Sequence, residues 1–396
     1  MVSMKIEYHE NDKKKGIKYD FSLIRKEFKR LKIPKDVYNP LTIPLEWSKF
    51  NVLLSPRSKG KTTNILLLGL IFNKLYGTVL QYIRSSHDMI TPSKAGSLFS
   101  VIQQNGYIDK LTDGKYNSIK LHWGSWYYTK VDDNGEVIEQ SEEIMKMLSI
   151  DRAEKYKSSY NAPNGDFIIF DEFIGKYYYP NEFVRFLDLF KTIQRDRISP
   201  IIFMLANTID RESEYFNELE IYEEIHTLEL GEDIKVTTDQ GTPIYIAILN
   251  NDDKLQKKQK VQNSLFYGFK NPQISSITGT DWAHVNYPHL PDKRTNDKIL
   301  DRRHYIKYSN RLINLELRHC DELGIYIYAH KATRLYDDSI IYTNEYMIED
   351  RRHRFLFGYT KMDKHIFTLY NQNKFYYQNN TVGSQVNNYI QTSKKI

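Results

Sequence analysis

The chain contains 396 residues, of which 40% are hydrophobic and 27% are charged, and its formal net charge is +6. This length exceeds one small domain and predicts two domains, each with its own core. The sequence has neither a long apolar run nor an apolar secretory signal, so we expect a cytoplasmic protein that does not enter a membrane. A single cysteine, Cys320, excludes an internal disulfide and a cysteine-based zinc site, and the eleven scattered histidines predict no structural metal.

The charge is unevenly distributed along the chain. Residues 1–49 hold 12 basic and 7 acidic side chains, residues 50–250 hold 21 and 28, and residues 251–396 hold 23 and 15. Basic ends around an acidic middle suit a catalytic core whose flanks contact a polyanion. Ordinary solvated surface charge is the alternative, because the excess is modest.

The periodicity of apolar residues predicts alternating strands and helices up to about residue 250. We expect strands at 50–54, 78–84, 166–170 and 201–205, helices at 21–31, 64–76, 97–104 and 181–195, and a hairpin turn at 133–135. This alternation predicts an α/β fold with a mainly parallel sheet covered on both faces.

Three domain-level segments follow from the same pattern. Residues 1–250 form an N-terminal α/β domain that begins with a basic extension over 1–45. The charge-rich run from Asn250 to Asn263 opens a linker over 251–285. Residues 286–396 form a smaller α+β domain, in which INLEL, GIYIYAH and SIIYTNEYMI read as successive strands.

SPRSKGKTT, between an apolar strand and an apolar helix, resembles a phosphate-binding loop in which serine replaces the first glycine. Gly60 permits close backbone approach to the phosphates, Lys61 reaches the terminal phosphates and the Thr62 hydroxyl ligates Mg²⁺. A basic surface turn is the alternative, and Arg57 either adds a second cation or points into solvent. The loop residues expected to hold ATP are Ser55, Pro56, Arg57, Ser58, Lys59, Gly60, Lys61, Thr62 and Thr63.

Asp171 and Glu172 directly follow the apolar strand DFIIF. This is the Walker B arrangement, in which the aspartate holds the Mg²⁺ shell and the glutamate polarises the attacking water as general base. Carboxylates that merely close a strand are the alternative. The phosphate loop upstream favours the catalytic interpretation.

Further candidates lie near these motifs. Arg195 and Arg197, at the end of the next helix, could reach a neighbouring subunit's nucleotide as an arginine finger, or simply complement the helix dipole. Asn207 follows the strand IIFML, where it either contacts the attacking water or forms a turn. Lys94 and Lys130 are candidates for DNA contacts in a pore, with solvated lysines as the alternative.

The segments SPRSKGKTT, YIRSS, KSSYNAPNGDFIIFDEFI, PNEFVRFLDLFKTIQRDR and FMLAN together resemble the DNA-packaging ATPase of phi-twenty-nine-like phages, a small relative of the large terminases. FDEFI, the PNE helix start and the R-x-R pair are the most specific shared features. The resemblance covers about residues 48–250 and is faint beyond, apart from KFYYQNNTVGSQVNNYI. Family loops commonly begin with glycine where this chain has Ser55, and the resemblance explains neither the longer N-terminal extension nor the linker.

The resemblance implies an additional-strand (ASCE) ATPase that uses ATP and Mg²⁺ to move double-stranded viral DNA into a preformed capsid. It implies a homo-oligomeric ring, a pentamer, docked on the portal of the prohead, and in some members a structural prohead RNA. The protein would then reside in the host cytoplasm and transiently at the portal vertex, not in the mature virion. The family's trans-acting finger corresponds to Arg195.

The family's C-terminal domain resembles an RNase H-like nuclease that has lost its metal-binding acids. INLEL, taken as the first strand here, carries only Glu316, and the later Asp337, Asp338 and Glu349 show no spacing for a two-metal site. We therefore expect nucleic-acid binding without nuclease activity. Three alternatives stay open: a terminase large subunit with an active nuclease, a nucleic-acid-binding scaffold with a non-hydrolysing pocket, and a DNA helicase or translocase.

Overall fold

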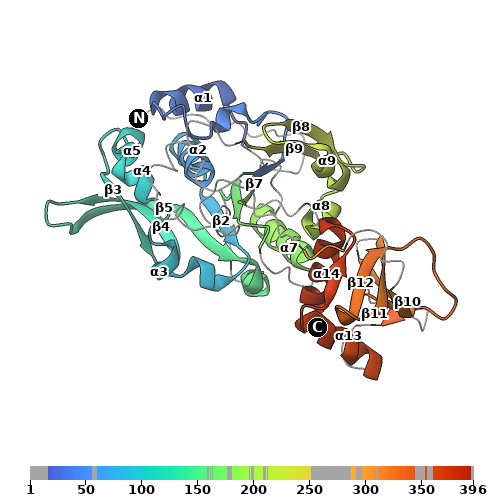
Figure 1. Ribbon diagram of the computed structural model, residues 1–396. Helices are drawn as coiled ribbons and strands as arrows, with labels where there is room; N and C mark the ends of the chain where they lie inside the picture. The colour runs from blue at the N-terminus through green and yellow to red at the C-terminus, as the bar shows by residue number, and fades with distance from the viewer. Residues whose placement is uncertain are drawn as a thin grey trace. The chain divides into compact units, whose positions relative to one another are not determined.

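The computed structural model divides into two compact units (Figure 1). The first is built on a nine-stranded sheet and the second on a six-stranded sheet. None of the helices among the described residues is long and apolar enough to cross a membrane. The expected linker over 251–285 lies outside the described residues, which are 17–55, 60–157, 160, 162, 164–175, 181–195, 197, 200–207, 211, 213–250, 287–290, 297–308, 311–343, 353–354 and 360–393.

The first sheet has the strand order β3-β4-β5-β2-β6-β7-β1-β9-β8. The six central strands in this order, which are β5, β2, β6, β7, β1 and β9, run parallel to one another. An antiparallel strand follows at each end, β4 beside β5 and β8 beside β9. β7 lies between β1 and β6, so the additional strand and the mainly parallel α/β fold are confirmed. The strands are β1 (Phe50–Leu54), β2 (Leu80–Arg84), β3 (Ser118–His122), β4 (Ser125–Val131), β5 (Val137–Ser149), β6 (Phe167–Asp171), β7 (Ile201–Ala206), β8 (Asp233–Thr237) and β9 (Pro243–Ile248).

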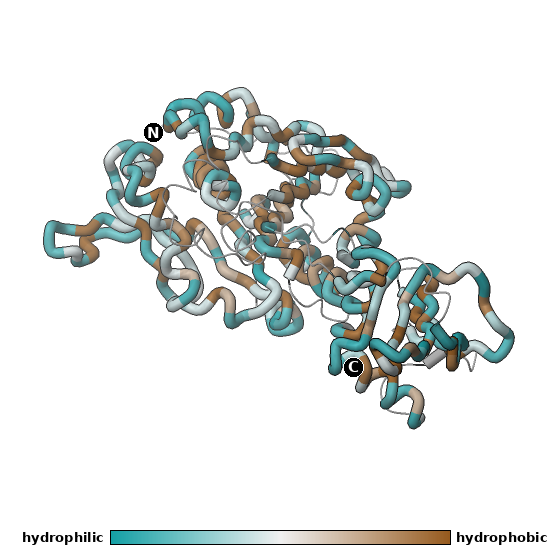
Figure 2. Tube along the Cα trace, viewed as in Figure 1, coloured by the Kyte–Doolittle hydropathy of each residue, from teal (hydrophilic) through white to brown (hydrophobic). Residues whose placement is uncertain are grey.

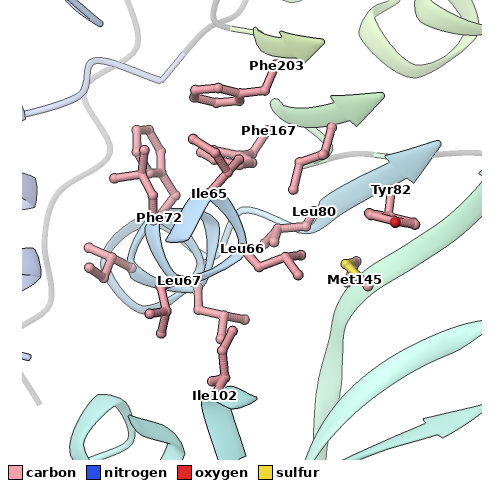
Figure 3. Packing of buried hydrophobic residues seen from close by; sticks show 14 of the residues in the cluster. Ile65, Leu66, Leu67, Phe72, Leu80, Tyr82, Ile102, Met145, Phe167 and Phe203 are labelled. Atoms are coloured by element: carbon pink, nitrogen blue, oxygen red, sulfur yellow. The ribbon is translucent and has the colours of Figure 1, made fainter. Parts of the chain in front are cut away.

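One face of this sheet is covered by α2 (Lys61–Tyr76), which is apolar around most of its circumference and therefore buried. Its side chains pack against Phe167 and Phe203 of the sheet (Figure 3). Gly69 permits this close approach, because a Cβ there would lie only 2.5 Å from the Leu80 side chain. Figure 2 shows the hydrophobic centre of the unit inside more hydrophilic outer segments.

The described part of the basic N-terminal extension packs on α2. In α1 (Phe21–Arg30), Ile24 and Phe28 enter the same core, and the Asp20 side chain caps the helix by accepting from the N–H groups of Ser22 and Leu23. Residues 17–49 are thus a layer of the first unit. Other helices of this unit are η1 (Pro40–Thr42), η2 (His87–Ile90), α3 (Pro92–Ala95), α4 (Ser100–Gln104), α5 (Tyr107–Leu111), η3 (Ile150–Arg152) and α6 (Ala153–Tyr156).

The opposite face of the sheet holds α7 (Glu182–Gln194). Phe186 of this helix stacks on Phe170, with ring centroids 5.1 Å apart, whereas Phe167 on the same strand contacts Phe72 of α2. Because side chains alternate along a strand, α2 and α7 cover opposite faces. α7 runs back from the end of β6 to the start of β7, and this return path determines where its last residues lie.

The second unit has the strand order β14-β13-β10-β11-β12-β15. The first three strands in sequence are antiparallel, and β13 and β14 continue the sheet in parallel beyond β10. This arrangement is compatible with an RNase H-like fold. The elements are α8 (Glu214–Glu218), α9 (Tyr222–Thr227), β10 (Lys298–Tyr308), β11 (Arg311–Cys320), β12 (Gly324–Lys331), β13 (Ile340–Tyr342), β14 (His353–Arg354), α13 (Lys361–Asn371), β15 (Phe375–Tyr377) and α14 (Asn380–Ser393); Thr227, the last residue of α9, belongs to the first unit.

The expectation that INLEL is the first strand of this sheet is wrong. β10 precedes it and carries Asp301, while INLEL lies within β11. The first half of β10 reads KILDRRH, and its register shifts between Ile299 and His304 break the simple alternation that marks a strand in the sequence.

Candidate nucleotide site

The candidate site lies at the edge of the first sheet where the parallel strands β1, β6 and β7 end. Ser55 follows β1, is buried, and its N–H donates to the Ala206 carbonyl at 3.1 Å. Gly60 has φ +68°, a left-handed conformation that favours glycine, and a Cβ there would lie 3.3 Å from the Val37 Cβ. Both constraints explain the glycine before α2. Pro56, Arg57, Ser58 and Lys59 lie outside the described residues.

Lys61 is the first residue of α2 and is buried. Its Nζ donates to the Ala206 carbonyl at 2.7 Å and to the Asn207 Oδ1 at 3.2 Å, both at the end of β7. Burial lowers the pKa of Lys61 to about 8, although the nearby carboxylates of Asp171 and Glu172 oppose this shift. The following Thr63 is half-buried.

The two carboxylates stand at the end of β6. The Thr62 Oγ1 donates to the Asp171 Oδ1 at 3.2 Å, so the hydroxyl and carboxylate expected to hold Mg²⁺ are adjacent. Glu172 has φ +52°, which is uncommon for a residue with a Cβ, and its side chain is 41% exposed. Such backbone strain is often found at functional sites.

Two functional candidates on β2 had no role in the sequence analysis. Ile83 pairs with Phe170, so the next residue, Arg84, lies beside Asp171. Its guanidinium forms ion pairs with Glu172 and, at 3.4 Å, with the Asp171 Oδ2, which also accepts from the Tyr82 hydroxyl at 2.7 Å. The signal was present in YIRSS: alternation along β2 places Tyr82 and Arg84 on one face.

Asn207 completes the group. Its Oδ1 accepts from Lys61, and its Nδ2 donates to the Glu172 Oε1 at 3.4 Å. The structure therefore brings together the predicted Lys61, Thr62, Asp171, Glu172 and Asn207 and adds Tyr82 and Arg84. Two cations and two carboxylates balance one another at this edge.

Arg195 and Arg197 lie elsewhere, at the edge where β6 and β7 begin. Arg197 Nε donates to the Asp166 Oδ1 at 2.7 Å, and Asp166 directly precedes β6. Arg195 is exposed, has φ +50°, and its Nη2 donates to the Tyr160 carbonyl at 3.1 Å. The pair thus divides into an exposed arginine and one held by its own subunit, so the expected exposure of the Arg197 guanidinium is not found.

The two lysines proposed for DNA contact are both exposed, and neither lies in the nucleotide site. Lys94 is on the short helix α3, and Lys130 is on β4 opposite Glu139. The expected hairpin turn is confirmed between β4 and β5, and this hairpin reaches outward from the sheet (Figure 1).

A cavity of about 310 Å³ lies between the N-terminal segment and the end of β9. β9 pairs in parallel with β1, so its end lies at the same sheet edge as Ser55. Val37, which contacts Gly60, also lines this cavity, together with Asn39 and Asn250. Its size and mixed polar and apolar lining suit a nucleoside beside the phosphate loop.

The lowered pKa of Lys61 predicts how the variant Lys61→Met differs from the wild type. Between about pH 8 and 10 the unfolded chain binds more protons at this lysine than the folded chain does. The contribution of Lys61 to the free energy of unfolding of the wild type therefore increases as the pH rises. Relative to the wild type, Lys61→Met should therefore lose on the order of 1–3 kcal/mol of stability between pH 7 and 10.

Urea unfolding without nucleotide at three pH values measures this difference. The exposed Lys26→Met is the matched control and should show no such trend. Parallel pH profiles of the wild type and Lys61→Met would show that folding does not lower the pKa of Lys61.

Comparison with known proteins gave matches only among solved structures, since no family model and no curated protein sequence matches the chain. The Phi-28 gp11 DNA packaging motor is 17% identical, with a TM-score of 0.55 over 91% of this chain and 99% of its own. A chain of the bacteriophage Phi-29 viral genome packaging motor assembly is 16% identical, with a TM-score of 0.55 over 91% of this chain and 100% of its own. The protein therefore has the fold of these phage packaging-motor chains.

Proposed function

We propose that this chain is the subunit of an ATP-hydrolysing motor that translocates double-stranded viral DNA into a preformed capsid. The observation that carries the proposal is the convergence of Lys61, Thr62, Asp171 and Glu172 at one sheet edge, with β7 inserted between β1 and β6. The likeness of the whole fold to the two packaging-motor chains supports the DNA-translocating role.

The residues present fit a nucleotide with Mg²⁺. Gly60 and the first N–H groups of α2 would bind the phosphates, and Thr62 with Asp171 would hold the metal. Mg²⁺ bound there would neutralise charge on the terminal phosphates. Lys61 would leave the Ala206 carbonyl for these phosphates, and the nucleoside would occupy the cavity beside Val37.

Hydrolysis is assigned to Glu172, which would accept a proton from the attacking water. In the present arrangement Arg84 and Asn207 both contact the Glu172 carboxylate. Arg84 therefore forms an ion pair with the proposed base in this arrangement, and the Glu172 carboxylate keeps acceptor sites for the attacking water.

Arg195 is proposed to act on the nucleotide of a neighbouring subunit. It lies where β6 begins, whereas Asp171 is the last residue of that strand, so a strand length of about 15 Å separates it from its own site. An arginine side chain does not span that distance. In a ring, the Arg195 edge of one subunit would meet the phosphate-loop edge of the next, while Arg197 stays on Asp166.

The remaining parts of the proposal concern the assembly. The motor would be a pentameric ring docked on the portal of the prohead, in the host cytoplasm and outside the mature virion, with a structural prohead RNA as a further partner. Double-stranded DNA would be contacted through its phosphates, because packaging has to ignore sequence, and Lys94 and Lys130 are exposed candidates for these contacts.

Glu172→Gln is expected to bind ATP with near wild-type affinity and to reduce the rate of ATP hydrolysis by about a hundredfold or more, because the amide cannot accept the proton. Binding of a fluorescent ATP analogue and release of phosphate measure the two properties separately. Glu142→Gln, on the exposed part of β5, should hydrolyse ATP normally. Wild-type turnover by Glu172→Gln would remove this residue from the mechanism.

A mixing experiment tests the trans role of Arg195. Arg195→Ala and Glu172→Gln should each be inactive alone, because each lacks one part of the shared site. Mixed rings should regain DNA-stimulated hydrolysis, since a Glu172→Gln subunit supplies Arg195 to a neighbour with an intact Glu172. Arg185→Ala, exposed on α7, is the control and should need no partner. Absence of recovery in demonstrably mixed rings would contradict action in trans.

We also propose that the second unit does not cut DNA. Burial would raise the pKa of Asp301 and Glu316, but Arg303 holds that of Asp301 at about 2, and His330 with Arg318 holds that of Glu316 at about 2. Among the described residues no cluster of three metal-binding side chains is present. These carboxylates are therefore engaged by arginine and histidine side chains of their own unit.

The purified protein with Mg²⁺ or Mn²⁺ is accordingly expected to leave supercoiled plasmid intact, as followed by agarose gel electrophoresis. Nicking that is lost in Asp338→Ala or Asp301→Ala would instead identify a functional nuclease and favour the terminase alternative.

A further inference from the structure

The Asp171 carboxylate is held on both of its oxygens. Oδ1 accepts from the Thr62 hydroxyl at 3.2 Å and from the Glu172 N–H at 3.1 Å. Oδ2 accepts from the Tyr82 hydroxyl at 2.7 Å and from the Arg84 Nη1 at 3.4 Å. The shortest of these four contacts is the one from Tyr82, a residue outside the phosphate-loop and Walker B motifs.

Tyr82 is buried in the interior of β2, with 3% of its surface exposed. Its ring lies near Met145 of the neighbouring strand β5 (Figure 3). A neutral phenol donates only one proton, and that proton is directed at Asp171, while the phenol oxygen accepts from the Arg84 Nη1 at 3.3 Å. Tyr82 thus bridges Arg84 and the carboxylate from a fixed position in the sheet.

The two oxygens of the Asp171 carboxylate have different donors: Oδ1 faces Thr62, and Oδ2 is held by Tyr82 and Arg84. Arg84 ends a long side chain and also pairs with Glu172, so it can change partners when Glu172 moves. Tyr82 has two side-chain torsions and is enclosed by the core, so its hydroxyl stays in place. A carboxylate anchored through Oδ2 by a buried donor keeps Oδ1 turned toward Thr62 whatever Arg84 does.

We propose that Tyr82 is a positioning residue that fixes the rotation of the Asp171 carboxylate and thereby sets the affinity of the site for the Mg²⁺ bound with ATP. The proposal rests on the proposed ATPase function of the same site. Loss of an outer-shell partner of a metal-holding carboxylate typically weakens metal binding tenfold or more, so an effect of about tenfold is expected from removing this hydroxyl.

The test measures binding of a fluorescent ATP analogue to the full chain, first in EDTA and then over a Mg²⁺ titration. Tyr82→Phe should bind the analogue in EDTA like the wild type but should need about tenfold more Mg²⁺ for half of the metal-dependent gain in affinity. Direct binding of Mn²⁺ to the nucleotide complex, followed by electron paramagnetic resonance, should weaken by the same factor. Unchanged metal dependence in a folded Tyr82→Phe protein overturns the proposal.

Tyr128→Phe is the matched control. Tyr128 is likewise buried, on β4, and among the described residues its hydroxyl has no hydrogen-bond partner. Its removal should leave the Mg²⁺ dependence unchanged. An equal shift in both variants would mean that loss of any buried hydroxyl loosens the domain, and would also overturn the specific role of Tyr82.

A second variant covers the case in which Tyr82→Phe does not fold. Tyr82→His, whose shorter ring cannot place an N–H donor where the phenol hydroxyl lies, is compared with Tyr128→His. If Tyr82 acts through Asp171, only Tyr82→His raises the Mg²⁺ requirement; equal changes in both variants overturn the proposal. Wild-type protein that fails to bind the analogue under any condition refutes the ATPase function, and with it the role of Tyr82, whereas normal binding with an unmoved metal dependence refutes Tyr82 alone.

Discussion

The structure of the first unit depends on charge balance at the end of β6. Asp171 and Glu172 face Lys61 and Arg84; Lys61 and Asp171 are buried, and a buried charged group without a partner is costly. Three neighbouring elements supply the partners: α2 contributes Lys61, β2 contributes Arg84, and β7 contributes the Ala206 carbonyl and Asn207. The strand order and the charge balance therefore depend on each other. Only with β7 between β1 and β6 does the end of β7 reach Lys61.

An incoming nucleotide would enter a site that is already neutral. Its phosphates would have to compete with the Ala206 carbonyl for Lys61, and the released carboxylates would need a new cation. Magnesium supplied with the nucleotide would provide that charge. These internal pairs are the contacts that a bound nucleotide would have to replace.

The sequence predicted the parts of the fold that are strongly periodic. The runs FNVLL, DFIIF and IIFML became buried parallel strands, and the apolar run after Thr63 became α2, because uninterrupted apolar segments bounded by turn residues have few other solutions. β10 was missed because its register shifts disturb the alternation of side chains. The three-dimensional partners of a charge, such as Arg84 for Glu172, depend on strand order and could not be read from spacing.

The arginine pair illustrates the same limit. Arg195 and Arg197 are two residues apart, and from the sequence alone either could be an arginine finger or could complement the helix dipole. The left-handed conformation of Arg195 ends α7 and turns its guanidinium toward the Tyr160 carbonyl and solvent, whereas Arg197 folds back onto Asp166. Two residues of one type at one helix end therefore differ in their surroundings, because one leaves the helix in a left-handed conformation and the other pairs with a buried aspartate.

The packing of the N-terminal segment, residues 17–49, beside Gly60 also determines which fragments of this protein can fold. Val37 contacts the glycine, the Tyr38 carbonyl accepts from the Asn64 side chain, and Phe28 covers the outer side of α2. A fragment that began at the first strand would expose an apolar helix to water and leave the glycine turn unsupported on one side. The smallest fragment that keeps this core closed therefore has to include α1 and the segment up to β1, so residues 17–49 belong to the folded first unit.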